Sequence, residues 1–444
     1  MAGTRGAARQ ACDGHMTIAL SSAVRKVVTN CHPVLRRVFR EFGRQGVRWA
    51  LLRVPEGGLA DPQSDVDLLV HPRDLSAAAS LLNQASFARV PRRSVSHHYL
   101  CYCADADRWL WLHVTTSVGF GSHRVALDDT SGCLARRHIR DGVAFLEPAA
   151  AFWLLLWHCL ILKGTVAAHH RAALADLCGA AAADDHFAAM FAAGCGGHAE
   201  LPARLLQLAL KGEWAAVEGC APAVHKIARV RECRQRMLRL ARGGAGDLSA
   251  PGLRVAVLGP DGAGKSTLIA GIRAAIPLPS RAIYMGLTGG ATRFVRRFPI
   301  PGVAFLATAA IIWSRYLRGW YHSARGRLVV FDRYIYDAVA PPASPLTRLQ
   351  RLSRRLSGHL CPQPDLTVFL DAPGGVMHAR KGAYTPQILE QWRTCFRTLS
   401  ARISAFHLVD ATRSCDEVRI DVVHEIWRRQ QRLWTRAGVA GGCP

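Results

Sequence analysis

The chain has 444 residues, of which half are apolar and a fifth charged, with a formal net charge of +25 and a pI near 10.3. This length exceeds what one hydrophobic core organises, so two or three domains are expected. The composition is ordinary for a globular protein, but the charge is not. Its excess is mostly arginine, which favours anionic partners such as nucleotides, nucleic acid or acidic membrane. Solvated basic faces are the alternative interpretation.

The cysteines indicate a reducing compartment. None of the fourteen forms a C-x-x-C pair, and Cys101 and Cys103 stand too close together for a zinc or redox motif. We therefore predict no structural metal and a cytoplasmic protein. Residues 1–16 contain no apolar core of a secretory signal. The apolar runs at 149–162 and 300–313 are shorter than the roughly 18 to 20 residues that cross a bilayer, so we expect no membrane span.

Residues 1–20 are predicted to be a disordered tail, followed by an α+β domain at 21–147. A helical pattern runs from Ser22 to Phe42 with a break near Pro33, and strands are expected at 49–53, 64–70 and 109–115. Asp65 and Asp67 stand two apart in the second strand, so their carboxylates project from one face. Two such carboxylates are candidate Mg²⁺ ligands.

This D-x-D strand resembles the signature of the minimal nucleotidyltransferase fold, over roughly residues 25–147. The resemblance implies that Asp65 and Asp67 bind a metal–nucleotide complex. The sequence departs from the pattern twice: the family's Gly-Ser turn is absent, and the strand expected to supply a third carboxylate offers His113 and Thr115. An active domain and a degenerate relic both stay open.

After Pro148 the sequence pattern becomes helical. Helices are expected at 149–162 and 167–177, and an Ala-rich stretch extends to about 215. We predict a helical subdomain at 148–241, as is appended in nucleotidyltransferase-like proteins. It ends in a basic amphipathic helix at 223–240, and 242–251 is predicted to be a linker.

The segment from Gly259 to Ser266 fits G-x-x-x-x-G-K-[ST], the phosphate-binding loop of nucleotide triphosphate sites. Its glycines let successive N–H groups point at a polyphosphate, Lys265 places a charge on the β/γ-phosphates, and the Ser266 hydroxyl is a Mg²⁺ ligand. An apolar strand at 255–258 precedes the loop, and a helix is expected from Thr267 onward, so the strand–loop–helix context is met.

The rest of the chain, 252–440, is predicted to be one α/β domain with a parallel sheet and flanking helices. Asp332 and Arg333 stand at the carboxyl end of an apolar strand, where open α/β sheets bind their ligands. The remaining expected strands are 281–286, 328–331, 364–371 and 408–410, and the expected helices are 303–324, 386–406 and 415–432.

The order of these motifs resembles thymidylate kinase and its nucleoside monophosphate kinase relatives, over about residues 252–435. The resemblance implies Mg²⁺-dependent phosphoryl transfer from ATP to a small phosphorylated acceptor. It assigns the transferred phosphoryl to Lys265, Mg²⁺ to Ser266 and Asp332, the acceptor phosphate to Arg333, and a lid to Arg380 with Lys381. The residues it assigns to nucleotide binding are Gly259, Asp261, Gly262, Ala263, Gly264, Lys265, Ser266, Thr267 and, beside adenine, Arg413.

The acceptor half departs from that family. Tyr284-Met285-Gly286 stands where an Arg-Glu-Pro-Gly stretch is expected, Asp337 replaces a serine, and the lid is short. Arg315 or Arg318 is a candidate replacement for the lost phosphate contact, although each also fits a surface arginine. Two other functions stay open: a nucleotidyltransferase regulated by its P-loop half, and a non-catalytic ATP-binding switch.

Other partners are less constrained. Arg348, Arg351 and Arg355 form one basic helical face, which nucleic acid or anionic lipid could use, but which reads more simply as a solvated face. Nucleic acid binding and a homodimer are both left open.

Overall fold

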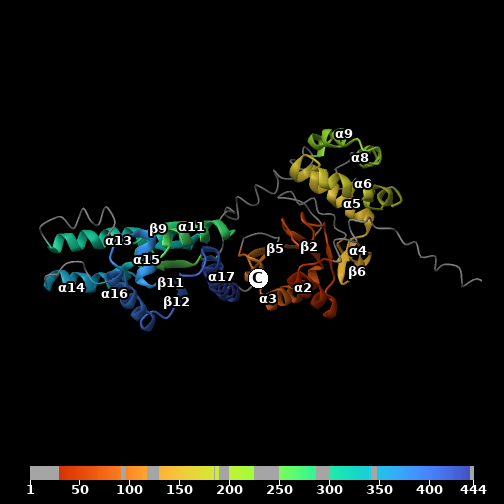
Figure 1. The fold of residues 1–444 in the computed structure, drawn as a ribbon. Coiled ribbons are helices and arrows are strands. Elements are labelled where there is room, and N and C mark those ends of the chain that lie inside the picture. The colour runs from red at the N-terminus through yellow and green to blue at the C-terminus, as the bar shows by residue number, and fades with distance from the viewer. Residues whose placement is uncertain are drawn as a thin grey trace, which may run out of the picture. The chain divides into compact units, whose positions relative to one another are not determined.

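The computed structural model describes residues 30–91, 97–117, 130–184, 186–189, 200–224, 250–286, 301–339, 341 and 348–440 (Figure 1). The chain divides into two compact units, residues 1–85 with 111–244 and residues 86–110 with 245–444. The expected tail, most of the basic helix at 223–240 and most of the linker at 242–251 lie outside the described residues. The domain boundaries drawn from the sequence stay predictions.

A seven-stranded mixed sheet has the order β3-β4-β5-β2-β1-β7-β6. The strands expected around residues 49–53, 64–70 and 109–115 are confirmed as β1 (Trp49–Leu51), β2 (Val66–Val70) and β5 (Arg108–Thr115). Helix α2 (Pro33–Arg44) begins at the proline that was expected to interrupt it. Six further elements were not expected from the sequence: α3 (Leu75–Gln84), β3 (Ala88–Arg89), β4 (His97–Cys103), α4 (Thr130–Ala135), β6 (His138–Arg140) and β7 (Val143–Phe145).

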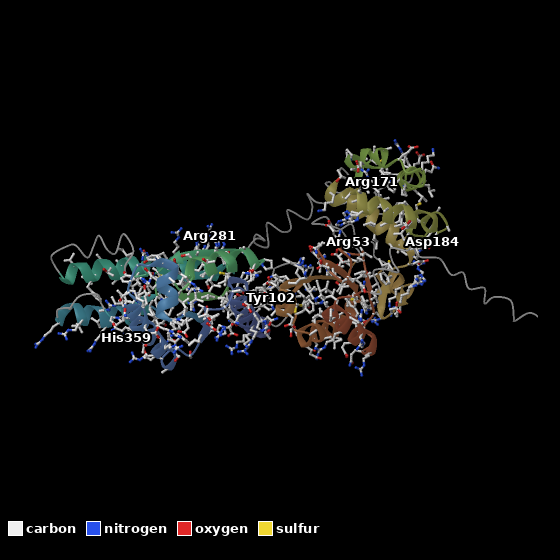
Figure 2. The ribbon with its side chains drawn as sticks, in the orientation of Figure 1. Arg53, Tyr102, Arg171, Asp184, Arg281 and His359 are labelled. Carbon is white, nitrogen blue, oxygen red and sulfur yellow. The ribbon has the colours of Figure 1, made fainter. Side chains whose placement is uncertain are left out.

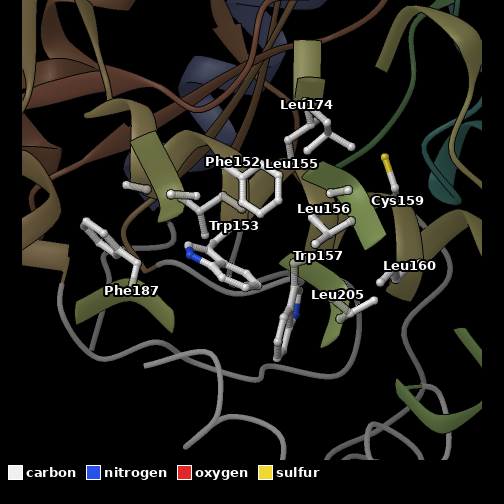
Figure 3. Close-up of a cluster of buried hydrophobic side chains, with 14 of the residues drawn as sticks. Phe152, Trp153, Leu155, Leu156, Trp157, Cys159, Leu160, Leu174, Phe187 and Leu205 are labelled. Carbon is white, nitrogen blue, oxygen red and sulfur yellow. The ribbon is translucent and has the colours of Figure 1, made fainter. Parts of the chain in front are cut away.

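The helical region is built around α5 (Pro148–Trp157), which continues as a π-helical segment, η3 (His158–Lys163), and ends at Gly164 with φ +69°. Nearly every side chain of α5 is buried, which explains why its sequence lacks a polar face. Trp153 and Trp157 pack with Leu156, Leu160 and Leu205 in one cluster (Figure 3). The other helices here are α6 (Ala168–Ala182), α8 (Glu200–Leu210) and α9 (Trp214–Gly219). Within the described ranges, no helix is both long and apolar enough to cross a membrane.

The second unit carries a five-stranded parallel sheet of order β12-β11-β8-β10-β9. Its strands are β8 (Arg254–Leu258), β9 (Ser280–Tyr284), β10 (Leu328–Asp332), β11 (Leu366–Asp371) and β12 (Phe406–Asp410). The interior strands β8, β10 and β11 are apolar without alternation, as strands covered on both faces are. The predicted α/β fold of the P-loop type, with a parallel sheet and flanking helices, is confirmed.

The helices of this unit are α11 (Lys265–Ala275), α13 (Pro301–Ala324), α14 (Arg348–Ser357), α15 (Gly374–Lys381), α16 (Pro386–Arg397) and α17 (Cys415–Ala440). The helix expected at 386–406 ends earlier, at Arg397, and the one expected at 415–432 continues to Ala440. Counterparts of α11, α13, α14, α16 and α17 were all expected. Helix α15 was not, because Arg380 and Lys381 were assigned to the start of a lid, whereas both lie in the last turn of this helix. Register places Asp332 beside Val257 and Tyr284, so the functional side chains after β8, β9 and β10 meet at one edge of the sheet.

Candidate functional site

The glycine-rich loop predicted to bind phosphate joins β8 to α11, which confirms the expected strand–loop–helix arrangement. Gly259, Gly262 and Gly264 have φ of +152°, +87° and +93°, a region that L side chains rarely adopt. At Gly262 a Cβ would also lie 2.2 Å from the carbonyl oxygen of Met377 on α15. Only glycine allows this approach, so the loop can curl around the N-terminus of α11, where free N–H groups and the helix dipole favour an anion.

Lys265 is buried at the first position of α11. Its Nζ donates hydrogen bonds to the carbonyl oxygens of Gly259 and Pro260, both at 2.7 Å. Burial, together with the charge of Arg333, lowers the pKa of this ammonium to about 8. The loop carbonyls therefore fix a buried cation at the N-terminus of α11. Because the ammonium is shielded from water there, it would attract a phosphate strongly.

Arg333 follows Asp332 at the end of β10 and has φ +65°, a left-handed conformation that is strained for arginine. Its N–H donates to the Val257 carbonyl at 3.1 Å, which anchors the strained residue to β8. Its guanidinium donates to Asp261 Oδ1 at 2.5 Å and lies 3.5 Å from Asp337 Oδ2. Two carboxylates on separate segments thus hold the guanidinium in the site.

The pKa values of these two carboxyl groups, Asp337 and Asp261, are shifted in opposite directions. Burial raises the pKa of Asp337 to about 6, in spite of Arg333 and Lys265 nearby. For Asp261, burial also favours the neutral form, but Arg333, Lys265 and Lys381 outweigh it and the pKa falls below its ordinary value. The sequence indicated no role for Asp337, yet its side chain is the carboxyl group with the raised pKa beside Arg333.

A cavity of about 740 Å³ brings the predicted residues together, a size typical of ligand sites. Of the predicted site residues it is lined by Asp261, Gly262, Ala263, Gly264, Lys265, Ser266, Thr267, Asp332, Arg333, Arg380 and Arg413. Gly259, at the start of the loop, is not among the lining residues. The lining also includes Lys381, expected in a lid, and Tyr284, Cys415, Asp416 and Arg419, for which the sequence indicated no role in the site.

The wall facing the loop is basic. Arg380 donates to the carbonyl oxygen of Ala411 at 3.0 Å, and Lys381 Nζ lies 3.5 Å from Asp261 Oδ2. Arg413, in the segment between β12 and α17, donates to Asp421 Oδ2 at 2.6 Å. Two segments therefore place cations around the loop, and Lys381 shares its carboxylate partner, Asp261, with Arg333.

Tyr284 lines the cavity beside Arg333, and both side chains pack against Gly286. A Cβ at Gly286 would lie 2.4 Å from the Tyr284 hydroxyl oxygen and 2.7 Å from Arg333 Cδ, so both side chains close over this glycine. Arg315 lies over the Tyr284 ring at 5.4 Å and donates to the Gly286 carbonyl at 3.2 Å. Neither Arg315 nor Arg318 belongs to the cavity lining, and Arg318 is exposed on α13.

Ser266 and Asp332 line the same cavity and fit a magnesium ion bound with a nucleotide. Among the described residues there is no group of three or more His, Cys, Asp or Glu side chains that could hold a metal ion alone. One hydroxyl and one carboxylate, completed by phosphate and water oxygens, is a donor set that Mg²⁺ commonly takes.

Asp65 and Asp67, the acid pair of the first unit, have surroundings that differ from each other. Asp67 is buried in β2, with Oδ1 2.7 Å from His113 Nδ1 and Oδ2 2.6 Å from Nε of Arg53, which is labelled in Figure 2. Burial opposes ionisation, but these partners lower the pKa of Asp67. Arg53 also contacts the ring of His158, whose pKa burial and Arg53 lower to about 4. Asp65 precedes the strand and is only half-buried, so the two carboxylates are not equivalent.

The comparisons with known proteins add little to this geometry. A scan against protein-family models finds no match, and a search of curated proteins gives none either. Among solved structures, a thymidylate kinase from Candida albicans is similar, with 20% identity and a TM-score of 0.36, over 41% of this chain and 94% of that one. The fold assignment rests on the strand order and loop of this chain itself.

Proposed function

We propose that the second unit transfers a phosphoryl group from ATP to a nucleoside monophosphate, dTMP-like, or to a related phosphorylated acceptor. One observation carries this proposal: a single cavity holds the phosphate-binding loop, the Asp332–Arg333 pair and the basic wall of Arg380, Lys381 and Arg413. Phosphoryl transfer needs two anionic groups placed in line and their developing charge neutralised. A cavity lined by cations from separate segments suits that task.

Each residue has a role in this proposal. Lys265 and the N–H groups at the start of α11 bind the β- and γ-phosphates of ATP. Arg333 binds the acceptor phosphate with its planar fork, and Asp261 keeps that fork aimed across the loop. Arg380 stabilises charge on the transferred group, and Arg413 flanks the adenine. Ser266 and Asp332 would hold Mg²⁺, which when bound would supply positive charge that neutralises the phosphates.

The surroundings of Arg333 leave the acceptor's identity open within this class. Tyr284 offers a ring face and a hydroxyl beside Arg333, and its position is fixed by Gly286 and Arg315. An acceptor with a flat base and a phosphate monoester would use both the ring and the guanidinium. We also propose a cytoplasmic setting, since the ten cysteines within the described ranges are all free.

The proposal is tested by incubating the full chain with γ-labelled ATP and Mg²⁺ and a panel of nucleoside monophosphates, sugar phosphates and unphosphorylated nucleosides. Label should move to a phosphorylated acceptor and to no unphosphorylated nucleoside. ATP binding without transfer to any member would favour the non-catalytic switch. Release of pyrophosphate in place of ADP would favour the nucleotidyltransferase, against which the engagement of Asp67 by Arg53 and His113 speaks.

A further inference from the structure

Helix α13 presents an apolar stripe on its outer side. Its inner side packs on the sheet through buried Ile312 and Tyr316 and through Gly319, where a Cβ would lie 2.6 Å from the ring of Phe331. The outer side chains recur three, four or seven residues apart, as one face of a helix requires. The α13 stripe consists of Val303, Leu306, Trp313, Leu317 and Trp320, which are 41–68% exposed.

The neighbouring helix α14, which packs against α13 (Figure 1), adds both apolar and basic side chains. Leu352 and Leu356 are 54% and 50% exposed. The α14 arginines are also exposed, on the part of that helix next to these two leucines; they are Arg348, Arg351 and Arg355. Arg354 differs, because its guanidinium bonds the carbonyl oxygens of Ala338 and Asp337 and holds α14 in place.

Both helices lie in parts of the sequence without acidic residues. No Asp or Glu occurs at 262–331 or at 338–364, whereas arginine is frequent in both stretches. The exposed arginines of α13 and α14 therefore have no carboxylate on their own helices to pair with. A surface that combines exposed Trp and Leu with unbroken positive charge is complementary to anionic headgroups above an apolar layer.

We propose that the α13 stripe and the α14 arginines dock the protein on the surface of an anionic lipid membrane. Trp313 and Trp320 would lie at the headgroup level, where tryptophan is favoured, and the aliphatic side chains would enter the acyl boundary. The arginines would contact headgroup phosphates. Helix α13 would lie in the plane of the surface, which agrees with the finding that no described helix can cross a membrane.

A second copy of the chain is a weaker candidate for this surface. A two-fold dimer brings the same patch of both copies together. Arg318 and Arg325 beside the stripe and the α14 arginines would then face like charges, with no acidic side chain on either helix to compensate. Lipid headgroups supply the missing negative charge.

The proposal is independent of the kinase activity and is tested with the full chain and sedimenting vesicles, one set of phosphatidylcholine alone and one containing about a third phosphatidylserine. We expect binding only to the anionic set, weakening as salt is raised. Trp313→Ser with Trp320→Ser, and separately Arg348→Gln with Arg351→Gln and Arg355→Gln, should each lower the partition coefficient tenfold or more, on the order of what one aromatic pair or three basic contacts contribute.

Matched controls lie elsewhere on the same unit. Leu408→Ser removes a 47% exposed leucine on β12, and the triple change Arg402→Gln, Arg432→Gln and Arg436→Gln removes three exposed arginines. Both should bind like the wild type. Equal losses in the controls would reduce the effect to net charge and overturn the proposed surface. Bromine-labelled lipids give a second readout: they should quench wild-type fluorescence more than that of Trp313→Phe with Trp320→Phe, a change that keeps the helix packing.

Two results would assign the surface to another partner and overturn the proposal. One is a stable dimer, seen by analytical ultracentrifugation, that Trp313→Ser with Trp320→Ser dissociates while no vesicle binding occurs. The other is binding of a single-stranded oligonucleotide, lost in the same variants, in the absence of binding to either vesicle set.

Discussion

Arg333 and Asp261 join the end of β10 to the phosphate-binding loop through a 2.5 Å hydrogen bond between guanidinium Nη2 and carboxylate Oδ1. The bond orients a residue whose left-handed backbone already costs about 1–3 kcal/mol. Such strain persists where the surroundings hold it in place, which the Val257 carbonyl, Asp261 and Asp337 do here. A fixed, forked cation opposite the loop is the basis of the first prediction.

Arg333→Lys should weaken use of the acceptor and leave ATP binding almost unchanged. Lysine keeps the charge but cannot hold a phosphate through two parallel hydrogen bonds, so kcat/KM for the acceptor should fall by roughly tenfold or more. Steady-state kinetics with varied acceptor, beside an ATP-binding titration, separate the two effects. Arg318→Lys, on the exposed side of α13 and outside the cavity lining, is the control and should change neither. Equal losses in both assays would make Arg333 a structural residue.

Lys265→Ala should lower ATP turnover by about two orders of magnitude or more, because it removes the charge proposed to neutralise the phosphates. Among the described side chains, no other donates hydrogen bonds to both the Gly259 and the Pro260 carbonyl oxygens and could replace it. The fold should survive, because removing a desolvated ammonium also removes its burial cost. Turnover and the circular dichroism melt are measured side by side. Arg273→Ala, exposed on the same helix, serves as the matched control. Wild-type turnover in Lys265→Ala would refute the assignment of the loop.

Gly262→Ala should damage the nucleotide site more than a change of one methyl group suggests. The alanine would need a left-handed φ and would place its Cβ 2.2 Å from the Met377 carbonyl oxygen, so α15 or the loop has to move. We expect ATP affinity to fall tenfold or more, on the order of the 1–3 kcal/mol that such strain costs. Gly375→Ala is the control, because its Cβ would meet nothing within 4 Å and its φ is not strained. An unchanged affinity would show that the loop adapts without cost.

The sequence was sufficient for the parts of this site that local patterns determine. The glycine loop and the apolar strand before it identify the anion site, and parallel strands bring their carboxyl ends to one edge, so Asp332 and Arg333 could be placed opposite Lys265. Asp337 and Tyr284 could not be given roles in this way. Their contribution depends on burial beneath Arg333 and on the close approach at Gly286, which are tertiary contacts without a motif.

In the first unit, contacts between distant segments determine the surroundings of the predicted acid pair. The spacing of Asp65 and Asp67 predicted two carboxylates on one face of a strand, but Asp65 precedes β2, and Asp67 is paired with Arg53 and His113, which lie outside that strand. Spacing along one strand cannot reveal such partners. Helix α15 was missed for a related reason, since the short stretch from Gly374 to Lys381 has two glycines at its start and little apolar periodicity.

Asp65→Ala combined with Asp67→Ala should leave phosphoryl transfer within about twofold of wild type, because the proposed transfer site lies wholly in the second unit. The same double change should destabilise the first unit by on the order of 3 kcal/mol, since Arg53 loses its buried carboxylate. Acceptor kinetics and urea unfolding measure the two effects. The single change Asp65→Ala, at a half-buried position, should cost little. A large loss of transfer in the double variant, with the fold intact, would mean that the two units are coupled in catalysis.

Asp337→Asn should reveal a pH-dependent cost of burying this carboxyl. Because burial raises its pKa from 3.8 to about 6, the folded protein binds the proton more tightly than the unfolded chain does. The cost is absent below about pH 4, grows as pH rises from 4 to 6, and stays constant above that. Asparagine does not titrate, so the variant should gain stability relative to wild type across this window, by about 2–3 kcal/mol for a shift of this size.

The measurement is the urea midpoint of both proteins between about pH 3 and pH 8, a range that brackets the pKa of 3.8 in the unfolded chain and of about 6 in the folded protein. The difference should widen up to pH 6 and then level off. If the loss of Asp337 frees Arg333, acceptor kcat/KM should fall in Asp337→Asn although the protein is more stable. A difference that is flat with pH would show that Asp337 is ionised throughout and is held by Arg333 in spite of its burial.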